Sequence, residues 1–172
     1  MILKPLNNSE KPCFRDKIGA LLAKCDSEFV PPLSSRSSTT QSNLSQSEVG
    51  DGISSYLNAL MEQEIICAID EDSLLAFVSY RTNYTCPEIG EDLTPNVYIS
   101  TLIVAPDARG CGITRKIYSY LFEKYSDRPV FTRTWSTNLA HIKILEGFGF
   151  SEHHRIKDHR GEGIDTVYFR LR

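Results

Sequence analysis

Hydrophobic and polar positions repeat with two different periods along this chain. Apolar residues recur at helical spacing over residues 13–25, 50–62, 113–125 and from Asn138 to about Glu146. Apolar, β-rich runs bounded by turn-forming residues predict strands over residues 2–6, 65–69, 74–81, 97–104, 130–134, about 150–158 and 164–171. The order of these elements predicts an α/β domain built on a central sheet.

The segment Val97–Val104 is the strongest predicted strand. Nearly all of its residues are β-branched or aliphatic, which is typical of a strand buried on both faces. We therefore expect it in the middle of the sheet. The two runs before it are joined by Asp70-Glu71-Asp72-Ser73 and predict an antiparallel hairpin, and Arg160-Gly161-Glu162-Gly163 predicts the turn of the closing pair.

Residues 33–48 interrupt this pattern. They contain seven serines, two threonines and one arginine, a composition too polar to form a core by itself. The sequence therefore predicts a mobile, Ser-rich loop within the domain.

Composition agrees with one globular domain spanning residues 1–172. A chain of 172 residues with 41% hydrophobic residues can bury a core without disulfides or structural metal ions. The five cysteines are widely spaced and form no CxxC pair, which favours neither a disulfide framework nor a zinc site. No apolar run suits a signal peptide or a membrane span, so we expect a cytoplasmic protein.

Charge is unevenly distributed between the two halves of the chain. Residues 1–96 carry 7 basic and 14 acidic residues, a net charge of −7, and residues 97–172 carry 12 and 8, a net charge of +4. A polyanionic ligand would prefer the second half and a cationic ligand the first, although uneven surface charge can also have no functional meaning. Neither half is basic enough to predict binding to nucleic acid.

The most informative segment follows the strongest strand. After Ala105-Pro106 the chain continues as Arg109-Gly110-Cys111-Gly112-Ile113-Thr114 into a predicted helix. Glycines allow close backbone approach, and the first N–H groups of a helix lack intrahelical partners, so a phosphate can bind there. A P-loop is excluded because no Lys-Ser/Thr pair follows, and a dinucleotide fingerprint would open nearer a first βαβ unit. An ordinary tight connection remains the alternative for this turn alone.

Two segments together resemble the GNAT acyltransferase family. Residues 109–114 are similar to its coenzyme motif, an Arg or Gln, two residues, Gly, one residue and Gly or Ala, with Thr114 in place of the last small residue. Residues 138–150 resemble its Asn-x-x-Ala helix that runs into a terminal Gly149-Phe150. The order of elements also follows the family over most of the chain.

The resemblance implies a three-layer fold and an acetyl-CoA site. The fold has a mixed sheet of about seven strands with helices on both faces, and its fourth and fifth strands splay apart. The exposed backbone of the fourth strand, here Leu102, Ile103 and Val104, would bind pantetheine and polarise the acetyl carbonyl. The turn and helix start would hold the pyrophosphate, and a helix asparagine would contact the pantetheine arm. The implied coenzyme contacts beyond the strand are Arg109, Gly110, Cys111, Gly112, Ile113, Thr114, Arg115 and Asn138.

The catalytic acid and base do not follow from the resemblance. The family tyrosine four residues before the Gly-Phe pair is Leu145 here, and a carboxylate found on the fourth strand of some relatives is Tyr98. Ser136 or water could replace the acid, although a serine there also suits a helix start, and Tyr98 with a usual pKa of about 10 is a poor base. Both Ser136 and Tyr98 are retained as candidates.

Other polar residues have weaker claims to a role. Acidic loop residues could hold a cationic amine through water, namely Glu88, Glu91 and Asp92. We expect the histidines near the last hairpin, His153, His154 and His159, to be exposed rather than metal ligands. His141 is expected on the surface and Trp135 in the core, although Trp135 could stack on a substrate. Cys111 lacks a recognisable base and is not predicted to be a nucleophile.

These observations predict an N-acetyltransferase that moves an acetyl group from acetyl-CoA directly to a primary amine. The rival interpretation is a non-catalytic acyl-CoA-binding or sensor module, favoured by the absent tyrosine and carboxylate. A third is an interaction protein on the same fold that binds no coenzyme. The expected partner is a small-molecule or peptide amine, with no nucleic acid or membrane, and a homodimer is left open.

Overall fold

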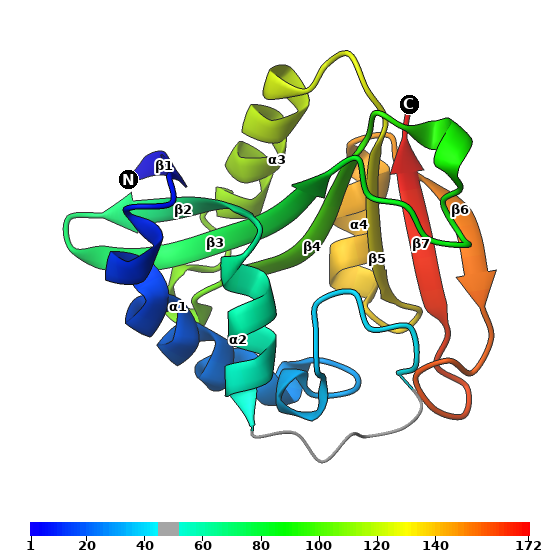
Figure 1. Cartoon of the computed structure of the whole chain (residues 1–172), viewed down its shortest axis with the longest axis horizontal. Helices are drawn as coiled ribbons and strands as arrows, with labels where there is room; N and C mark the ends of the chain where they lie inside the picture. The colour runs from blue at the N-terminus through cyan, green and yellow to red at the C-terminus, as the bar shows by residue number, and fades with distance from the viewer. Residues whose placement is uncertain (45–51) are drawn as a thin grey trace.

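The computed structural model describes residues 1–44 and 52–172, and its central feature is a twisted sheet (Figure 1). The described strands form one seven-stranded sheet in the order β1-β2-β3-β4-β5-β7-β6. Their bounds are Ile2–Leu6 (β1), Glu64–Asp70 (β2), Ser73–Thr82 (β3), Val97–Val104 (β4), Val130–Trp135 (β5), Ser151–Ile156 (β6) and Thr166–Leu171 (β7). The α-helices of the described residues are Lys11–Cys25 (α1), Ile53–Met61 (α2), Ile113–Lys124 (α3) and Leu139–Gly147 (α4). These elements confirm the predicted order and fold class.

Strand pairing is antiparallel on both sides of one parallel junction. The antiparallel set β1 to β4 meets the antiparallel set β5, β7 and β6 where β4 runs parallel to β5. That junction has three residue pairs, the last of which is Ile99 with Thr132. Beyond this pair β4 and β5 continue without pairing, so the sheet opens in its middle as the resemblance implies.

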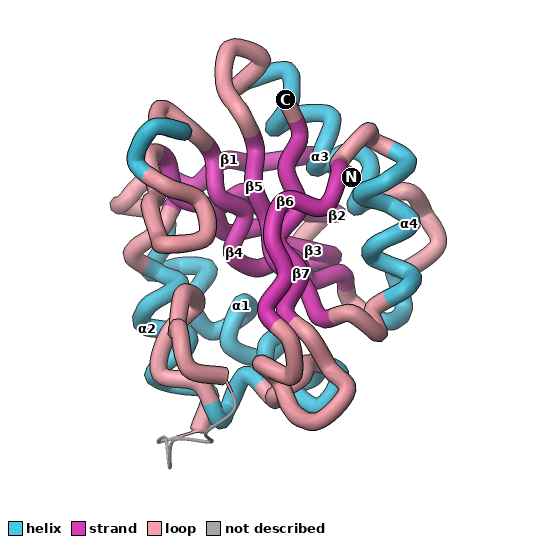
Figure 2. Tube along the Cα trace, turned by 90° about the vertical axis from the view of Figure 1, so that its right-hand side faces the viewer, coloured by secondary structure: helices cyan, strands magenta, loops and turns pink. Residues whose placement is uncertain are grey.

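Helices cover both faces of the sheet. Helices α1 and α2 pack with Ile65, Cys67 and Phe77 on one face. Helices α3 and α4 pack with Ile66, Ala68 and Val78 on the other. Figure 2, a quarter turn from Figure 1, shows α3 and α4 on one side of the strands and α1 and α2 on the other. The alternation of side chains along β2 produces these two cores, because neighbouring residues of a strand point to opposite faces.

The central position predicted for Val97–Val104 is confirmed with one qualification. Val97, Tyr98 and Ile99 are buried, whereas Ser100, Leu102 and Val104 are half-buried. The change occurs where β5 departs, because one edge of β4 then loses its neighbouring strand. The exposure of β4 therefore begins where the sheet opens.

The Ser-rich segment makes more core contacts than its composition predicts. A short 3-10 helix, η2, spans Leu33–Ser35, and Leu33 and Leu44 are buried although most of their neighbours are polar. Three polar residues of the segment, Arg36, Thr39 and Gln41, are also buried, and Gln41 accepts from the N–H of Ser37 at 2.8 Å. Residues 45–48 of the predicted loop lie outside the described residues, and its mobility stays a prediction.

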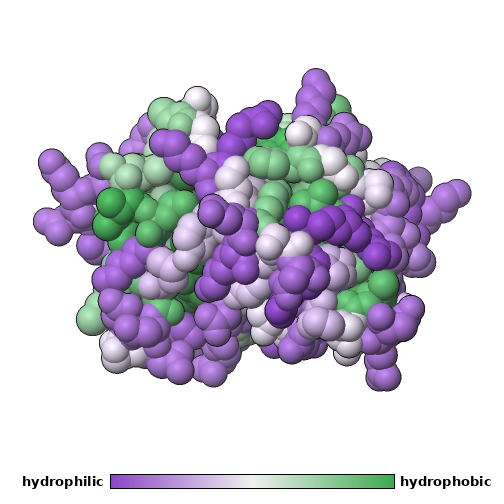
Figure 3. Space-filling model, turned by 90° about the horizontal axis from the view of Figure 1, so that it is seen from above, coloured by the Kyte–Doolittle hydropathy of each residue, from purple (hydrophilic) through white to green (hydrophobic). Residues whose placement is uncertain are grey.

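The surface carries small hydrophobic areas within a hydrophilic coat, as Figure 3 shows for one face. Large hydrophobic side chains that are exposed include Met1, Ile2 and Leu139. Among the described helices, none combines the length and the apolar character that crossing a membrane requires.

Candidate active site

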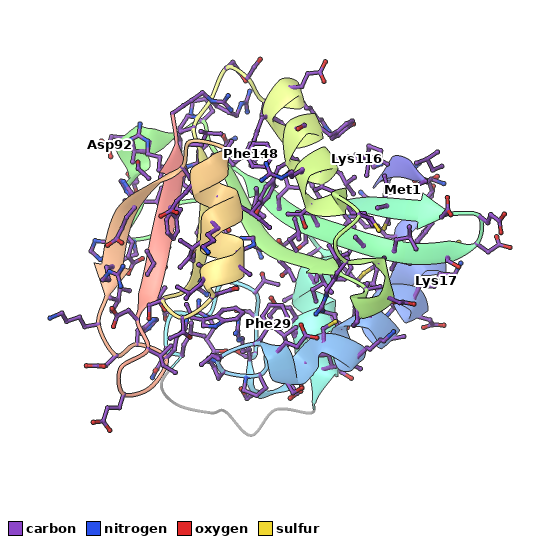
Figure 4. All side chains as sticks on the ribbon, turned by 180° about the vertical axis from the view of Figure 1, so that it is seen from behind. Met1, Lys17, Phe29, Asp92, Lys116 and Phe148 are labelled. Carbon is purple, nitrogen blue, oxygen red and sulfur yellow. The ribbon has the colours of Figure 1, made fainter. Side chains whose placement is uncertain are left out.

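The opening between β4 and β5 forms a cleft of about 630 Å³, within the usual size range of small-molecule sites. Its floor is the unpaired part of β4, and its far wall is the end of β5. The start of α3 and the start of α4 also line the cleft. Figure 4 shows the molecule from the side of α3 and α4. Lys116 is labelled on α3, Phe148 at the end of α4 and Phe29 close to the end of α1.

The glycine turn has the backbone shape expected of an anion site. Gly110 and Gly112 have φ angles of 77° and 73°, which glycine adopts without the cost that a Cβ imposes. Gly112 is the N-cap of α3 and supplies no capping side chain, so the first N–H groups of the helix face outward at its positive end. A Cβ at either glycine would meet nothing within 4 Å. The turn therefore leaves open space beside free backbone donors.

The arginine of the motif is directed away from this turn. One Nη atom of Arg109 donates to both oxygens of Glu28, at 3.0 and 2.8 Å, and its Nε donates to the carbonyl of Val104 at 3.2 Å. This ion pair is half exposed and joins the turn to the end of α1. The Cys111 side chain is exposed and, among the described residues, does not belong to the cleft lining. Arg109 itself still lines the cleft. The roles of Arg109 and Cys111 as coenzyme contacts stay predictions.

The open edge of β4 presents backbone groups to the cleft. The N–H of Ala105 donates to Leu75 on β3 at 2.8 Å, and backbone groups of an antiparallel strand point alternately to its two neighbours. The N–H groups of Leu102 and Val104 therefore face the side that β5 has left. Ile103 instead directs its side chain into the core beneath α1 and α2.

Tyr118 and His141 form a hydrogen-bonded pair in the cleft wall. The hydroxyl of Tyr118 on α3 lies 3.1 Å from Nε2 of His141 on α4, and both residues line the cleft. Burial raises the pKa of Tyr118 above its usual range and lowers the pKa of His141 to about 4, so both groups are neutral at neutral pH. His141 is half-buried in the wall of the cleft, whereas the sequence predicted a surface residue.

The α4 motif fits the family pattern only approximately, because His141 stands three residues after Asn138. The Asn138 side chain accepts from the N–H of His141 at 3.4 Å and donates to the hydroxyl of Thr134 at 3.1 Å. It therefore caps α4 and ties it to β5 while lining the cleft. These contacts keep the asparagine fixed at the place where a pantetheine contact was expected.

Aromatic and basic side chains line the cleft where the segment after α1 meets the end of β5. Phe29 follows α1, Trp135 ends β5, and their ring centroids lie 5.6 Å apart. Arg133 of β5 also lines the cleft and donates to the carbonyl of Gln41 at 2.8 Å. Trp135 thus lies in the site, although the sequence favoured a core position for it.

The two catalytic candidates from the sequence are not brought into the cleft. Ser136 accepts from the N–H of Asp165 at 3.0 Å and, like Tyr98, is absent from the described cleft lining. Tyr98 is fully buried among aromatic side chains, with Tyr84 at 4.4 Å between ring centroids, and burial raises its pKa to about 12. The sheet geometry explains the second case, since the Tyr98 side chain points away from the α3 face. The acidic loop residues Glu88, Glu91 and Asp92 are also outside the lining.

Sequence reasoning missed Tyr118, His141, Arg133 and Phe29 as site residues. Tyr118 was predicted only as an inward residue of its helix. For Arg133 a local signal exists, because a charged residue stands in the middle of a buried strand. Among the described residues, no cluster of His, Cys, Asp or Glu suits a metal ion.

Comparisons with known proteins agree with this geometry. The model of the acetyltransferase (GNAT) family matches residues 34–150. Similar solved structures include an aminoglycoside 6'-N-acetyltransferase complexed with coenzyme A, with 15% identity, a TM-score of 0.69 and coverage of 99% of this chain and 96% of that chain. A ribosomal-protein-alanine N-acetyltransferase from Brucella melitensis shows 15% identity, a TM-score of 0.64 and 99% coverage of both chains. For yncA from Salmonella typhimurium with its cofactor acetyl-CoA, the identity is 14%, the TM-score 0.61 and the coverage 100% and 93%.

At these identities the structural likeness establishes the fold, and no protein of curated function matches the sequence at a significant level. The family match extends over more than half of the sequence and includes both the glycine turn and α4. The chain therefore belongs to the GNAT acetyltransferase family.

Proposed function

We propose that this protein transfers an acetyl group from acetyl-CoA directly to a primary amine. One observation carries the proposal: the unpaired edge of β4 and the donor-rich start of α3 face the same cleft. A ligand with a pyrophosphate at one end and a thioester at the other matches this arrangement, because each end meets the backbone donors that suit it.

The residues present fit the coenzyme. Open space at the Cβ positions of Gly110 and Gly112 leaves room for phosphate oxygens beside the N–H groups of the turn. Arg115 follows in the first turn of α3 and lines the same cleft. Its guanidinium lies 5.6 Å from the ring centroid of Phe148, where its positive charge would favour an anionic ligand.

Catalysis on this scaffold rests mainly on positioning. The N–H groups of Leu102 and Val104 would donate to the thioester oxygen as negative charge develops on it. The amine must arrive neutral to attack, and after attack it carries the proton that the leaving thiolate finally takes up. A second side-chain acid is therefore not required for the atoms to balance.

Tyr118 is our candidate for stabilising the leaving sulfur. Its raised pKa keeps the hydroxyl protonated, so that it can donate a hydrogen bond to a thiolate without losing its proton. His141, neutral for the reason given above, can hold the hydroxyl in place. This role replaces the family tyrosine, whose position is occupied by the buried Leu145.

The experiment that separates this proposal from a non-catalytic sensor module is thiol release. Purified protein with acetyl-CoA and a panel of primary amines should release free CoA thiol at a rate that depends on the amine. Tight binding of acetyl-CoA without release across the panel would support the sensor instead. Absence of any acetyl-CoA binding would leave only an interaction protein on the same fold.

A further inference from the structure

Three arginines come together beside the cleft, around Phe29 and Trp135. Arg36 follows η2, Arg133 lies in β5 and Arg160 lies in the connection between β6 and β7. Their charges act on one another, although they are far apart in the sequence. We call these three residues the arginine cluster.

The arginine cluster borders the cleft through aromatic side chains. Arg133 lines the cleft directly. The guanidinium of Arg36 lies 5.8 Å from the ring centroid of Phe29, and that of Arg160 lies 5.8 Å from the ring of Trp135. Phe29 and Trp135 line the cleft and contact each other. The arginine cluster therefore places positive charge directly behind this part of the cleft wall.

The hydrogen-bond partners of the cluster are neutral. Arg36 donates to the carbonyl of Pro31 at 3.1 and 2.6 Å. Arg160 donates to the carbonyl of Val30 at 2.7 Å and to the hydroxyl of Thr166 at 2.9 Å. Arg133 donates to the carbonyl of Gln41 and, at 3.3 Å, to the hydroxyl of Tyr168. These bonds fix the directions of the guanidiniums and leave their charge in place.

Carboxylate partners are missing from the described part of the chain. Across residues 1–44 and 52–172, no acidic side chain forms an ion pair with any member of the arginine cluster. Asp26 acts on Arg36 from a distance, but its two oxygens accept from the N–H and hydroxyl of Ser34, each at 2.7 Å. The cluster therefore lacks an anionic partner among these residues.

Burial makes this arrangement costly for the folded protein. Arg36 and Arg160 are each only 6% exposed, and burial together with the neighbouring arginines lowers the pKa of Arg160 to about 9. All three groups still carry their charge at neutral pH. Unpaired buried charges destabilise a fold, and an oxyanion that enters the cleft would offset this cost through charge-assisted hydrogen bonds.

The orientation of β5 places Arg133 and Trp135 on the face of the sheet opposite to α4. Thr134 points toward α4, where Asn138 binds it, so the adjacent Arg133 and Trp135 point to the opposite face. Coenzyme would enter from the α3 and α4 face, and the arginine cluster lies on the other. The remaining reactant, the acetyl acceptor, would then occupy the side of the cleft that the arginine cluster borders.

We propose that the acetyl acceptor is an anionic amine, a molecule that carries a carboxylate or a phosphate group in addition to its primary amine. This inference rests on the proposed function and specifies its substrate class. Arg133 would contact the oxyanion, and Arg36 and Arg160 would strengthen the attraction from behind the two aromatic rings. A planar guanidinium suits either oxyanion, because it can donate two parallel hydrogen bonds.

The test compares acceptors with and without an anionic group. Propylamine and β-alanine amide lack an anionic group, whereas β-alanine and O-phosphoethanolamine carry one, and hexylamine and 6-aminohexanoate form a longer pair. The anionic acceptors should have kcat/KM values about tenfold or more above their neutral counterparts, as expected for a hydrogen bond to a charged group. The better of the carboxylate and phosphate acceptors identifies the anion. Equal use of charged and neutral amines would overturn the inference and leave the proposed function intact.

Variants locate the recognition. Arg133→Gln should remove the preference for anionic amines, so that the ratio of kcat/KM for β-alanine to kcat/KM for propylamine falls to near one, mainly through a raised KM for β-alanine. Arg128→Gln is the matched control, since Arg128 pairs with Asp127 outside the cleft lining, and it should keep the preference. A preference that survives Arg133→Gln would contradict the assignment.

Binding provides a readout that does not need turnover. Calorimetric titration of the CoA-saturated protein with β-alanine and with propylamine should rank them in the same order, and Arg133→Gln should abolish the difference. If no amine releases thiol but β-alanine still binds selectively, the proposed function fails and the anion site stands. If β-alanine binds no better than propylamine, the anion site is refuted whatever the turnover.

Discussion

Tyr118 is the side chain on which the proposed transfer step depends most. A hydrogen-bond donor removed from the charge that develops in a transition state typically lowers kcat about 100- to 1000-fold. Tyr118→Phe keeps the packing volume and deletes the hydroxyl that bonds His141, so we expect a kcat loss of at least about 100-fold with acetyl-CoA affinity nearly unchanged. Steady-state kinetics and calorimetry measure the two quantities.

Tyr120→Phe is the control for that variant, because Tyr120 lies on the same helix outside the described cleft lining. It should keep the kcat of the unmodified protein. A Tyr118→Phe enzyme that also keeps its kcat would exclude the hydroxyl from the chemical step, and backbone and water would remain as the means of catalysis.

Substitutions at Ser136 and Tyr98 test the two catalytic candidates that the sequence suggested. Ser136→Ala removes the acceptor for the Asp165 N–H, so it should lower the free energy of unfolding by about 1 kcal/mol. Because neither side chain reaches the cleft, we expect Ser136→Ala and Tyr98→Phe each to change kcat by less than about tenfold, below the usual range for a general acid. A larger loss in either variant would show that the cleft rearranges when substrate binds.

His141 should make the fold sensitive to moderate acid. Its pKa is about 4 in the folded protein against an ordinary value of 6.5, so the folded state binds fewer protons than the unfolded state between these values. Stability is then fully present above pH 6.5 and falls as the pH drops toward 4. The contribution is on the order of 1–3 kcal/mol.

Urea unfolding at pH 7.5 and pH 5 measures this contribution. The difference in stability between the unmodified protein and His141→Gln isolates the imidazole from other titrating groups. That difference should shift in favour of the variant as the pH falls. A difference that does not change with pH would refute the lowered pKa of the half-buried His141.

Among the elements, the turn between β4 and α3 should determine whether the protein binds the coenzyme. Acetyl-CoA at a hundredfold excess over its dissociation constant should stabilise the protein by about 2.7 kcal/mol. Gly112→Asp places a carboxylate in the open space beside the turn, where it would repel phosphate. The shift in thermal midpoint on adding acetyl-CoA should therefore disappear while the apo protein stays folded.

Gly163→Asp is a closely matched control. Gly163 has the same φ of 73°, and a Cβ there also meets nothing within 4 Å, but it lies between β6 and β7. It carries a similar backbone strain without the phosphate site. A thermal shift retained in Gly112→Asp, or lost in Gly163→Asp, would place the coenzyme elsewhere.

The elements themselves could be predicted because their signals are local. The run Val97–Val104 identifies a central strand, and the glycines after Arg109 identify the start of a helix, without any knowledge of distant residues. Even the opening of the sheet was expected, although from resemblance and not from periodicity. The buried contacts of residues 33–44 were not, because Leu33 and Leu44 reach the core through contacts that a serine-rich composition hides.

At the scale of the whole molecule, the cleft has two chemically different ends. The coenzyme end comes from consecutive residues of one strand, turn and helix, so its sequence motif is visible. The proposed acceptor site is assembled from Phe29, Arg36, Arg133 and Arg160, which the fold brings together from three separate segments. No spacing in the sequence relates these residues, which is why the arginine cluster could not be predicted from the sequence alone.

Direct transfer between two molecules bound in one cleft predicts a fixed balance of products. Acetyl-CoA and β-alanine are incubated with the protein, and released thiol and N-acetylated β-alanine are quantified together by mass spectrometry. Direct transfer should give one acetylated amine for each thiol released and no burst of thiol when the amine is omitted. Thiol release stoichiometric with protein in the absence of amine, together with an acetylated cysteine, would contradict it.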